Sequence, residues 1–328
     1  MNENAIVACL RAGRWQPPAL AQRLHATVEE VTACLRALCA EGLVTGNDQH
    51  GYALTPAIEW LDAEAIATTL TPPVRAAIDQ LQVEWCVDST NARLLDAELV
   101  PQRVRVLLAE RQSAGRGRRG RGWVSPPGAN LYLSLLREFA ADWAALAGLS
   151  LAVGVAAARA LDDLALPGVT LKWPNDLQID GRKLGGILIE TRERHERLRV
   201  VIGIGLNVRM PQAAAEGIDQ PWADVASLTD ARVSRNALAA ALLERMLPAL
   251  AVFERDGLAP FLHDYAQRDA LHGRALRVEN DRGAQFGIGH GIAPDGALRL
   301  LTDEGERLIY AGEASVRVDA GTQRDGRE

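Results

Sequence analysis

The sequence predicts an α+β protein built from three parts, and three observations support this prediction. Residues 5–60 contain three short helical segments followed by a hairpin pattern. The middle of the chain alternates strand-like runs with apolar helical segments, and the chain after Gly273 changes to short strands separated by turn sequences. With 328 residues and 48% hydrophobic content, the chain is long enough for two or three domains.

The N-terminal part is expected to be a separate domain over residues 1–62. Its three helical segments cover 6–10, 19–24 and Val28–Ala40. Thr27 is placed to cap the third helix, with Glu30 at the capping-box position. Short strands on either side of the polar turn 46–51 complete an outline similar to a winged helix-turn-helix domain, in which Val28–Ala40 would contact DNA.

The charge of this domain leaves its role open. Residues 1–70 carry four basic and eight acidic side chains, and Glu29 and Glu30 lie where a DNA-binding helix is expected to meet phosphates. A winged helix domain also serves as a dimerisation or regulatory module. Residues 63–73 are predicted to be a linker, because Thr71-Pro72-Pro73 is expected to stop regular structure.

The central domain, residues 74–270, is predicted to be a mixed sheet with helices packed on it. Strands are expected at 83–87, 104–109, 130–136, 183–190 and 199–207, and helices at 74–81, 92–99, 146–164, 236–253 and 258–267. Asp88-Ser89-Thr90-Asn91 lies at the first strand-to-helix turn. One of these residues is explained as a helix N-cap, but three adjacent polar side chains also suit a small polar group such as a ureido or amide head.

A basic loop from Glu110 to Asn130 separates two of these strands. Between Arg111 and Trp123 it contains five arginines and four glycines. A protein core does not absorb so many guanidinium groups, so we expect an exposed, mobile loop whose backbone N–H groups and charges bind a polyanion. Because the net charge of the chain is −6, the loop is a local feature, which favours a specific anion site over general nucleic-acid binding.

Two of the 36 basic residues are lysines, Lys172 and Lys183, which leaves 34 arginines. Lysine provides a compact charge that arginine does not replace at a phosphate or a reacting carboxylate. Lys172 begins the turn Lys172-Trp-Pro-Asn-Asp176, which brings together a cation, an amide and a carboxylate. An Asx-type turn at the surface is the alternative explanation, which the tryptophan next to an isolated lysine disfavours.

Two of the predicted strands each contain two glycines, which carry no side chain. Lys183 precedes Gly185 and Gly186 in one strand, and Gly203 and Gly205 lie in the next. Glycines within a strand let a ligand or another backbone approach closely, so the two strands are expected to form the floor of a flat pocket. Close packing of a helix on the sheet is the alternative explanation.

The remaining sequence features predict the fold of the C-terminal part and the cellular compartment of the protein. Short strands at 275–278, 285–292, 297–301 and 308–318 predict a small SH3-like barrel over residues 271–328. A cytoplasmic protein is expected, because no apolar run approaches the roughly 20 residues of a membrane span and the N-terminus lacks the basic start of a signal peptide. The four cysteines show no metal-ligand spacing and are expected to be reduced.

Five motifs in this order resemble those of biotin protein ligases, specifically the bifunctional bacterial type that also represses the biotin operon. They are Asp88-Ser-Thr-Asn91, Gln112-x-x-Gly-Arg-Gly-Arg-Arg-Gly-Arg121 with Trp123, Lys172-Trp-Pro-Asn-Asp176, Lys183-Leu-Gly-Gly-Ile187 and Gly203-x-Gly-x-Asn207. The resemblance implies activation of biotin by ATP and Mg²⁺ to biotinyl-5′-AMP, followed by transfer to a lysine of the biotin carboxyl carrier protein of acetyl-CoA carboxylase. It also implies a homodimer when the adenylate is bound, and operator DNA as a partner.

The same resemblance implies roles for individual residues. The biotin site would consist of Ser89, Thr90, Asn91, Gln112, Gly115, Arg116, Gly117, Arg118, Lys183, Gly185 and Gly186. The ATP and adenylate site would consist of Arg119, Arg121, Trp123, Lys172, Asn175, Asp176 and Asn207. Lys183 and Arg118 would be catalytic, Asp176 would support Mg²⁺, and Tyr310 would lie near the adenine. The helix Val28–Ala40 lacks the Ser-Arg start and the lysine typical of the repressors, which bears on operator binding rather than on ligation.

Three alternatives come from other functional classes. A regulator that binds biotin or its adenylate without turnover is disfavoured by the motifs around Lys172 and Lys183. A lipoate or octanoyl transferase of the related fold is disfavoured by the Gly-Arg-Gly-Arg-Arg-Gly loop. An RNA-binding segment at 116–121 would be expected to show repeats and low complexity, and the chain shows neither.

Overall fold

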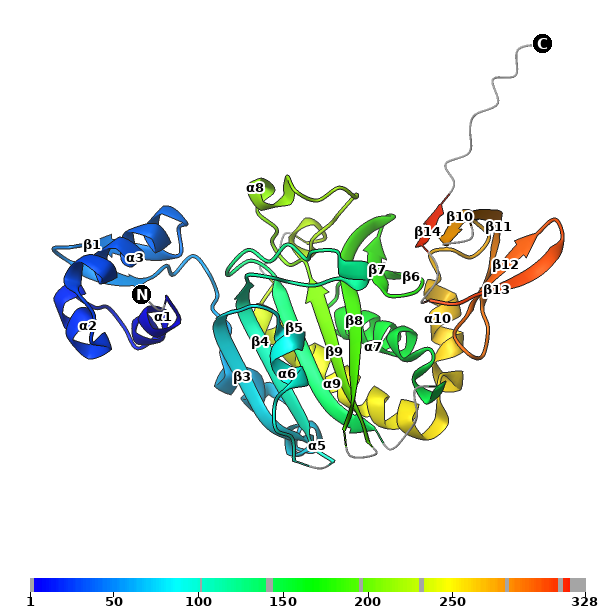
Figure 1. Cartoon of the computed structure of the whole chain (residues 1–328), viewed down its shortest axis with the longest axis horizontal. Helices are drawn as coiled ribbons and strands as arrows, with labels where there is room; N and C mark the ends of the chain where they lie inside the picture. Colours follow the sequence, from blue (N-terminus) through cyan, green and yellow to red (C-terminus); the bar gives the residue numbers. More distant parts are fainter. Residues whose placement is uncertain are drawn as a thin grey trace, which may run out of the picture.

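The computed structural model has three groups of elements along the chain (Figure 1). It describes residues 3–100, 102–139, 144–194, 197–229, 233–280, 283–311 and 315–318. The N-terminal group consists of α1 (Glu3–Arg11), α2 (Pro17–Leu24), α3 (Val28–Ala40) and the hairpin of β1 (Val44–Asn47) and β2 (Gly51–Leu54). The three helices and the hairpin expected from the sequence are therefore confirmed.

Helix α3 starts where its cap predicts. The Thr27 side chain accepts from Glu30 N, and the Glu30 carboxylate accepts from Thr27 N at 3.0 Å, which completes the capping box. Val31, Leu35 and Leu38 face the core of this group. Glu30 is thus used to begin the helix.

The prediction of an irregular linker at residues 63–73 is wrong. The segment contains α4 (Ala63–Thr69) and the start of α5 (Pro72–Ala77). Proline suits the first positions of a helix, where its missing N–H has no intrahelical partner, so Pro72 and Pro73 begin α5 instead of preventing it. Ile66, Leu70 and Val74 are buried in the core of the central group.

A seven-stranded sheet forms the central group, in the order β3-β4-β5-β9-β8-β7-β6. The strands are β3 (Ile78–Val87), β4 (Val104–Gln112), β5 (Leu131–Phe139), β9 (Arg197–Leu206), β8 (Arg182–Arg194), β7 (Asp176–Ile179) and β6 (Thr170–Lys172). β3 pairs with β4 in parallel, and the other described pairs of this sheet are antiparallel, so the sheet is mixed as expected. The helix expected at 74–81 ends at Ala77, because Ile78 already pairs with Val104 in the parallel ladder.

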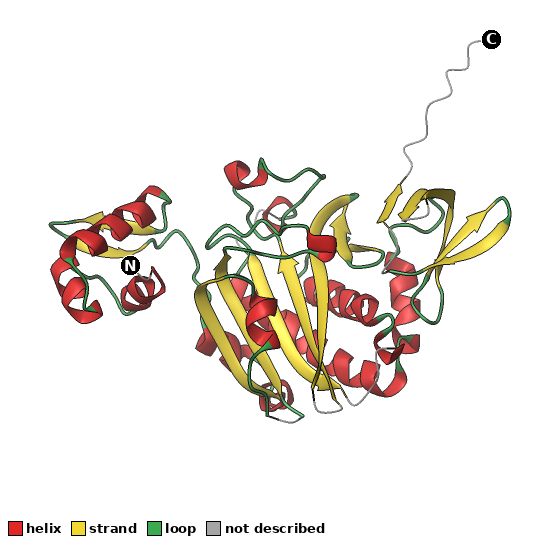
Figure 2. Ribbon diagram, viewed as in Figure 1, coloured by secondary structure: helices red, strands yellow, loops and turns green. Residues whose placement is uncertain are grey.

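Helices lie on both faces of this sheet, as Figure 2 shows. The long helices α7 (Leu149–Asp163) and α9 (Arg235–Asp256) pack together on one face, and the short helix α6 (Thr90–Leu95) lies on the other with the basic loop. Further short helices are α8 (Gln212–Ala215) and α10 (Leu262–Arg268), and single turns of 3₁₀-helix lie at η1 (Arg118–Gly120), η2 (Ala144–Leu146), η3 (Val225–Ser227) and η4 (Ala259–Phe261). By length and composition α9 would be able to cross a membrane, but half of its apolar stretch is buried inside the protein.

The C-terminal group is a five-stranded antiparallel sheet in the order β13-β12-β11-β10-β14. Its strands are β10 (Ala275–Asn280), β11 (Gly283–Ile292), β12 (Leu298–Thr302), β13 (Gly305–Ile309) and β14 (Ser315–Val318). The single strand expected at 308–318 is wrong, because it comprises parts of two strands at opposite edges: Ile309 pairs with Leu298, whereas Val316 pairs with Val278. All four cysteines are free thiols.

Candidate active site

A buried polar cluster forms where β3 ends and α6 begins. Ser89, Thr90 and Asn91 are each at most 4% exposed. Ser89 caps α6 by accepting from Ala92 N at 3.5 Å, and Thr90 donates from its N and Oγ1 to Gln112 Oε1 at 2.9 and 3.2 Å. Gln112 is the last residue of β4, so the parallel pairing of β3 with β4 brings these motifs together. The sequence-predicted neighbours are therefore adjacent.

Ser134 is a member of this cluster that sequence reasoning missed. Its Oγ is fully buried on β5 and lies 2.7 Å from Thr90 Oγ1 and 2.6 Å from Asn91 Oδ1. In the sequence, Ser134 is the single polar residue of the run Leu-Tyr-Leu-Ser-Leu-Leu apart from the tyrosine hydroxyl. A lone serine in a buried strand needs a hydrogen-bond partner, and that requirement was the available signal.

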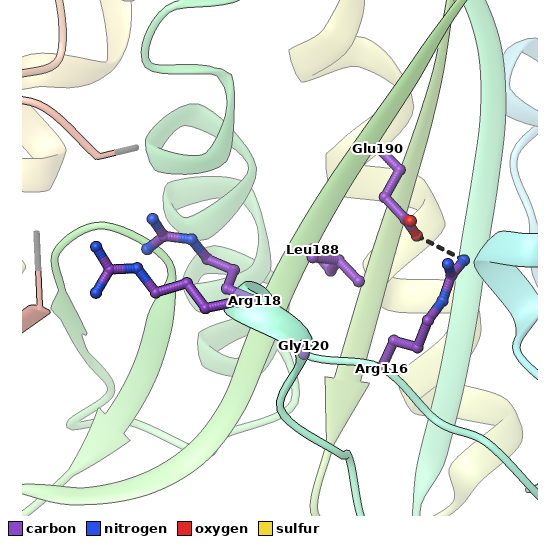
Figure 3. Close-up of a pocket in the computed structure, with 7 residues that line it drawn as sticks. Arg116, Arg118, Gly120, Leu188 and Glu190 are labelled. Carbon is purple, nitrogen blue, oxygen red and sulfur yellow. Dashed lines mark hydrogen bonds and ion pairs between the residues drawn. The ribbon is translucent and has the colours of Figure 1, made fainter. Parts of the chain in front are cut away.

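Glu190 is a second residue that sequence reasoning missed. Its Oε2 accepts from Asn91 Nδ2 at 2.9 Å. It also accepts from Arg116 Nη2 at 3.0 Å, the contact drawn in Figure 3. The Asn91 amide also donates to Leu188 O at 3.2 Å. Arg116, expected to close over a ligand, therefore lies against a carboxylate of β8.

Two strand glycines face protein side chains instead of an open floor. A Cβ at Gly203 would lie 2.3 Å from Asn91 Oδ1, and one at Gly205 would lie 2.5 Å from Trp123 Cε2. A Cβ at either position would force the neighbouring side chain to move, so glycine lets Asn91 and Trp123 lie close to the strand. Asn91 and Trp123, both predicted site residues, therefore lie over this part of the sheet.

Gly185 and Gly186 face opposite sides of β8, as successive strand residues do. A Cβ at Gly186 would contact Lys183, Trp123 and Asp176 at 3.4 to 3.6 Å. A Cβ at Gly185 would instead meet Gly205 O and the core leucines 206 and 177. Gly186 faces the candidate site, and a side chain at Gly185 would face the core.

A cationic cluster lies at the other end of the site. Lys183 Nζ is 2.7 Å from Asp176 Oδ1, with both side chains less than one fifth exposed, and lies 5.5 Å from the centre of the Trp123 ring. Arg118 Nη1 donates to Asn175 Oδ1 at 3.3 Å, and Arg118 Nη2 donates to Ala311 O next to the C-terminal sheet. The strand pairing β7 with β8 sets Asp176 opposite Gly186, which brings the two lysine motifs together.

Burial affects the charged groups at this end. It lowers the pKa of Lys172, and the nearby Asp176 opposes that shift. Burial also lowers the pKa of Arg118, helped by the positive charge of Arg119 and opposed by Asp176. Lys172 and Asp176 are backbone partners in the antiparallel ladder of β6 and β7. The expected convergence of a cation, an amide and a carboxylate is therefore present. An anion bound here would relieve the crowding of like charges.

Asn207, which the resemblance assigns to the ATP and adenylate site, contacts the start of β8. It is 3% exposed, and its Nδ2 donates to Ala223 O at 3.1 Å and to Lys183 O at 3.4 Å. Its amide nitrogen thus holds the start of β8, which carries Lys183. Tyr310 is half exposed on the C-terminal part and donates to Asp295 Oδ2 at 3.1 Å.

The basic loop folds back on itself above the sheet. Gly117 N donates to Arg121 O at 2.7 Å, Trp123 N donates to Gly115 O at 2.9 Å, and Arg119 adopts a left-handed conformation with φ of 57°. Arg119 and Arg121 are exposed. A Cβ at Gly115 would lie 2.5 Å from Trp123 O, which explains this glycine.

A cavity of about 510 Å³ lies beneath this loop. It is lined by Arg116, Gly117, Arg118, Arg119, Gly120, Leu188 and Glu190. Arg116 and Arg118 point in opposite directions from the loop (Figure 3). Among the described residues, no group of three or more His, Cys, Asp or Glu side chains is placed to hold a metal ion.

Comparison with known proteins agrees with this geometry. Residues 84–207 match the Biotin/lipoate A/B protein ligase family, and residues 271–317 match the Biotin protein ligase C terminal domain. The chain is 38% identical over 270 residues to the bifunctional ligase/repressor BirA of Escherichia coli, covering 81% of each protein. It is 36% identical to the biotin–[acetyl-CoA-carboxylase] ligase of Mycobacterium tuberculosis, over 74% of this chain and 87% of the relative.

A solved structure is also similar. The biotin protein ligase from Aquifex aeolicus in complex with biotin and ATP matches with a TM-score of 0.63 and 28% identity, over 74% of this chain and all of that one. The motifs, the site they form and the extent of these matches agree. The chain belongs to the biotin protein ligase family.

Proposed function

We propose that this protein is a cytoplasmic ATP-dependent biotin protein ligase. It activates biotin to biotinyl-5′-AMP and then attaches biotin to a lysine of the biotin carboxyl carrier protein of acetyl-CoA carboxylase. One observation carries the proposal: a buried cluster of neutral hydroxyl and amide groups and a cluster of cations lie at two ends of one site, joined by the basic loop. Such a site fits a ligand with a neutral polar head and a carboxylate tail.

The neutral end is proposed to bind the ureido head. Thr90 bonds to Gln112, Ser89 accepts from Ala92 N, and Asn91 bonds to Ser134 and Glu190, so their dipoles are oriented before the ligand arrives. Pre-organised polar groups lose little entropy on binding. Gly115 and Gly117 let the loop backbone approach the ligand, and Gly186 leaves room beside Lys183.

The cationic end is proposed to carry the chemistry. The biotin carboxylate attacks the α-phosphorus of ATP, an O–P bond forms, and the bond to pyrophosphate breaks. Lys183 and Arg118 neutralise the negative charge that gathers between the two anions. The carrier lysine amine then attacks the acyl carbon, and AMP leaves with the electrons of the acyl–oxygen bond.

Asn175, Lys172, Trp123, Arg119 and Arg121 are proposed to contact the nucleotide, with Asn207 holding the start of β8. Mg²⁺ arriving on ATP would supply further positive charge at the phosphates. Mg²⁺ needs few protein carboxylates because it keeps phosphate and water ligands. Asp176 provides one carboxylate, whose Oδ1 contacts Lys183, and this fits an ion held mainly by the nucleotide.

The purified protein tests the proposal directly. With biotin, ATP and Mg²⁺ it should release pyrophosphate, and with an apo carrier domain it should transfer labelled biotin to the acceptor lysine. A lysine-to-arginine carrier domain is the control and should remain unlabelled. Transfer of lipoate in place of biotin would refute the assignment.

The flanking parts are proposed to be domains of their own. The boundaries are 1–62 for a winged helix-turn-helix domain, 74–270 for the ligase domain and 271–328 for an SH3-like barrel. The match to a bifunctional ligase/repressor and the three helices followed by a hairpin support a second activity, which is adenylate-dependent binding of operator DNA by a homodimer through α3.

The contacts of the N-terminal arginines predict how operator binding should depend on salt. Each contacts another group of the protein: Arg11 the Leu61 carbonyl, Arg14 the Gly51 carbonyl, Arg23 the Trp15 ring and Arg36 the Asp48 carboxylate. Operator binding should therefore depend only weakly on salt, since few counterions are released. A gel shift upstream of biotin-synthesis genes, with and without biotin and ATP across a salt series, measures this. No shift in any condition would leave the domain as a dimerisation module.

A further inference from the structure

One chain of hydrogen bonds begins and ends in the basic loop and passes through the buried sheet. From Arg116 it runs to Glu190 and Asn91, with distances of 3.0 and 2.9 Å. Ser134 and Thr90 continue it to Gln112. Gln112 Nε2 then donates to Ser125 Oγ at 3.0 Å, and Ser125 Oγ donates to Trp123 O at 3.0 Å. Both sides of the loop are thus tied to one buried network.

Glu190 is the negative group of this chain. One oxygen, Oε2, receives both the Asn91 amide and the Arg116 guanidinium, and the Glu190 side chain is 24% exposed. The other members between Asn91 and Trp123 are neutral. A carboxylate accepts stronger hydrogen bonds than a neutral oxygen, so the link to Arg116 depends on this charge.

The same carboxylate sets the orientation of the Asn91 amide. The Nδ2 donors go to Leu188 O and Glu190 Oε2, while Oδ1 lies against Ser134 and above Gly203. Reversing the amide would place its oxygen next to the carboxylate, which is repulsive. Glu190 therefore fixes the orientation of this amide together with Leu188 O and Ser134.

We infer that Glu190 is a positioning residue: it fixes the Asn91 amide and fastens the basic loop to β8 through Arg116. The identity of the ligand beneath the loop rests on the proposed function, but the fastening does not. Loss of the Glu190 charge loosens the loop and weakens binding of the ligand head, while the reacting end keeps its Lys183 and Arg118 groups.

The first experiment needs no ligand. Limited subtilisin digestion of the full chain reports opening of residues 113–123. Glu190→Gln and Arg116→Gln should each raise the cleavage rate about fivefold, and the double variant should be no faster than either single variant. The control is Glu193→Gln, an exposed carboxylate on the same strand, which should cleave at the wild-type rate.

The second experiment uses steady-state pyrophosphate release. Glu190→Gln should raise the KM for biotin about fivefold and leave kcat within about twofold, because the charge acts on binding of the head. A merely structural role would lower the melting temperature without this separation of KM from kcat. If Glu190→Gln does not fold, Arg116→Gln still tests the fastening.

The two experiments distinguish failure of the inference about Glu190 from failure of the proposed function. Wild-type cleavage rates in both single variants, or additive effects in the double variant, would overturn the inference. A wild-type protein without pyrophosphate release would refute the proposed function and leave the digestion result to decide the role of Glu190.

Discussion

The neutral and the cationic end of the site differ in the partners of their polar groups. At the neutral end, Ser89, Thr90, Asn91 and Ser134 are at most 4% exposed, and Ser134 contacts both Thr90 and Asn91. At the cationic end, Lys183 has a single described carboxylate neighbour, and Arg118 is held by an amide oxygen and a backbone carbonyl. The polar groups of the first arrangement have hydrogen-bond partners, whereas the second has more positive charge than its neighbours balance.

This difference indicates how binding and chemistry are divided. Satisfied, buried dipoles recognise a neutral head by shape and hydrogen bonding, and removing one leaves its partner unpaired. Excess positive charge lowers the energy of a transition state in which two anions meet. Changes at the neutral end should alter the KM for biotin, and changes at the cationic end should alter turnover or the handling of ATP.

Lys183→Ala should have the largest effect. Removing the ammonium group is expected to lower the rate of pyrophosphate release by roughly 100- to 1,000-fold, because a positioned cation at the reacting centre is lost. Single-turnover assays measure the rate, and circular dichroism should show an unchanged fold. Arg182→Ala, an exposed neighbour that ion-pairs with Asp180, is the control. Retention of more than a tenth of the activity by Lys183→Ala would contradict the assigned role.

Gly205→Ala should have the second-largest effect, because it disturbs both the neutral and the cationic end of the site. The new Cβ would lie 2.5 Å from the Trp123 ring, which must move away from the strand and from Lys183. We expect a loss of roughly 1–3 kcal/mol in the free energy of unfolding and a tenfold or greater rise in the KM for biotin. Thermal melting and tryptophan emission measure these changes. Gly217→Ala, where a Cβ meets nothing within 4 Å, should behave as wild type.

Ser134→Ala should separate the two ends. The substitution removes a hydroxyl between Thr90 and Asn91 and leaves buried polar atoms without that partner. At roughly 1–3 kcal/mol for such a loss, the KM for biotin should rise about tenfold. The KM for ATP should remain at the wild-type value. Equal increases in both constants would show that the ends do not act separately.

The smallest expected effect is a pH dependence at the cationic end. Burial lowers the pKa of Lys172, so its positive charge is present below that pKa and is lost, as pH rises, at a lower pH than for an exposed lysine. Affinity for ATP should therefore fall a few-fold on the alkaline side. Isothermal titration across pH measures it, and Lys172→Arg should flatten the curve because arginine stays charged. A flat wild-type profile would exclude Lys172 from nucleotide binding.

Short-range features of the fold were predictable from the sequence. The capping box at Thr27 and Glu30 and the turn after Lys172 depend on residues close in the chain, and both are present. The motifs also predicted which residues gather at the site. The helices at residues 63–73 were missed because their burial comes from packing on α9, far away in sequence.

The missed site residues share a cause. Ser134 and Glu190 contact Asn91 from strands 43 and 99 positions away, and no local pattern around them shows those contacts. Gly185 and Gly186 are alike in the sequence, and the pairing of β8 with its neighbours decides which of them faces the site. These contacts depend on strand register, which the motifs do not reveal.

The contact between Arg118 and Ala311 has a consequence for how the C-terminal part tolerates change. Arg118 donates to the backbone carbonyl of residue 311, which every amino acid provides. Substitutions at this position leave the acceptor in place, but inserting or deleting one residue after β13 moves it. The spacing of the chain between β13 and Ala311, rather than its chemical composition, sets where this arginine rests.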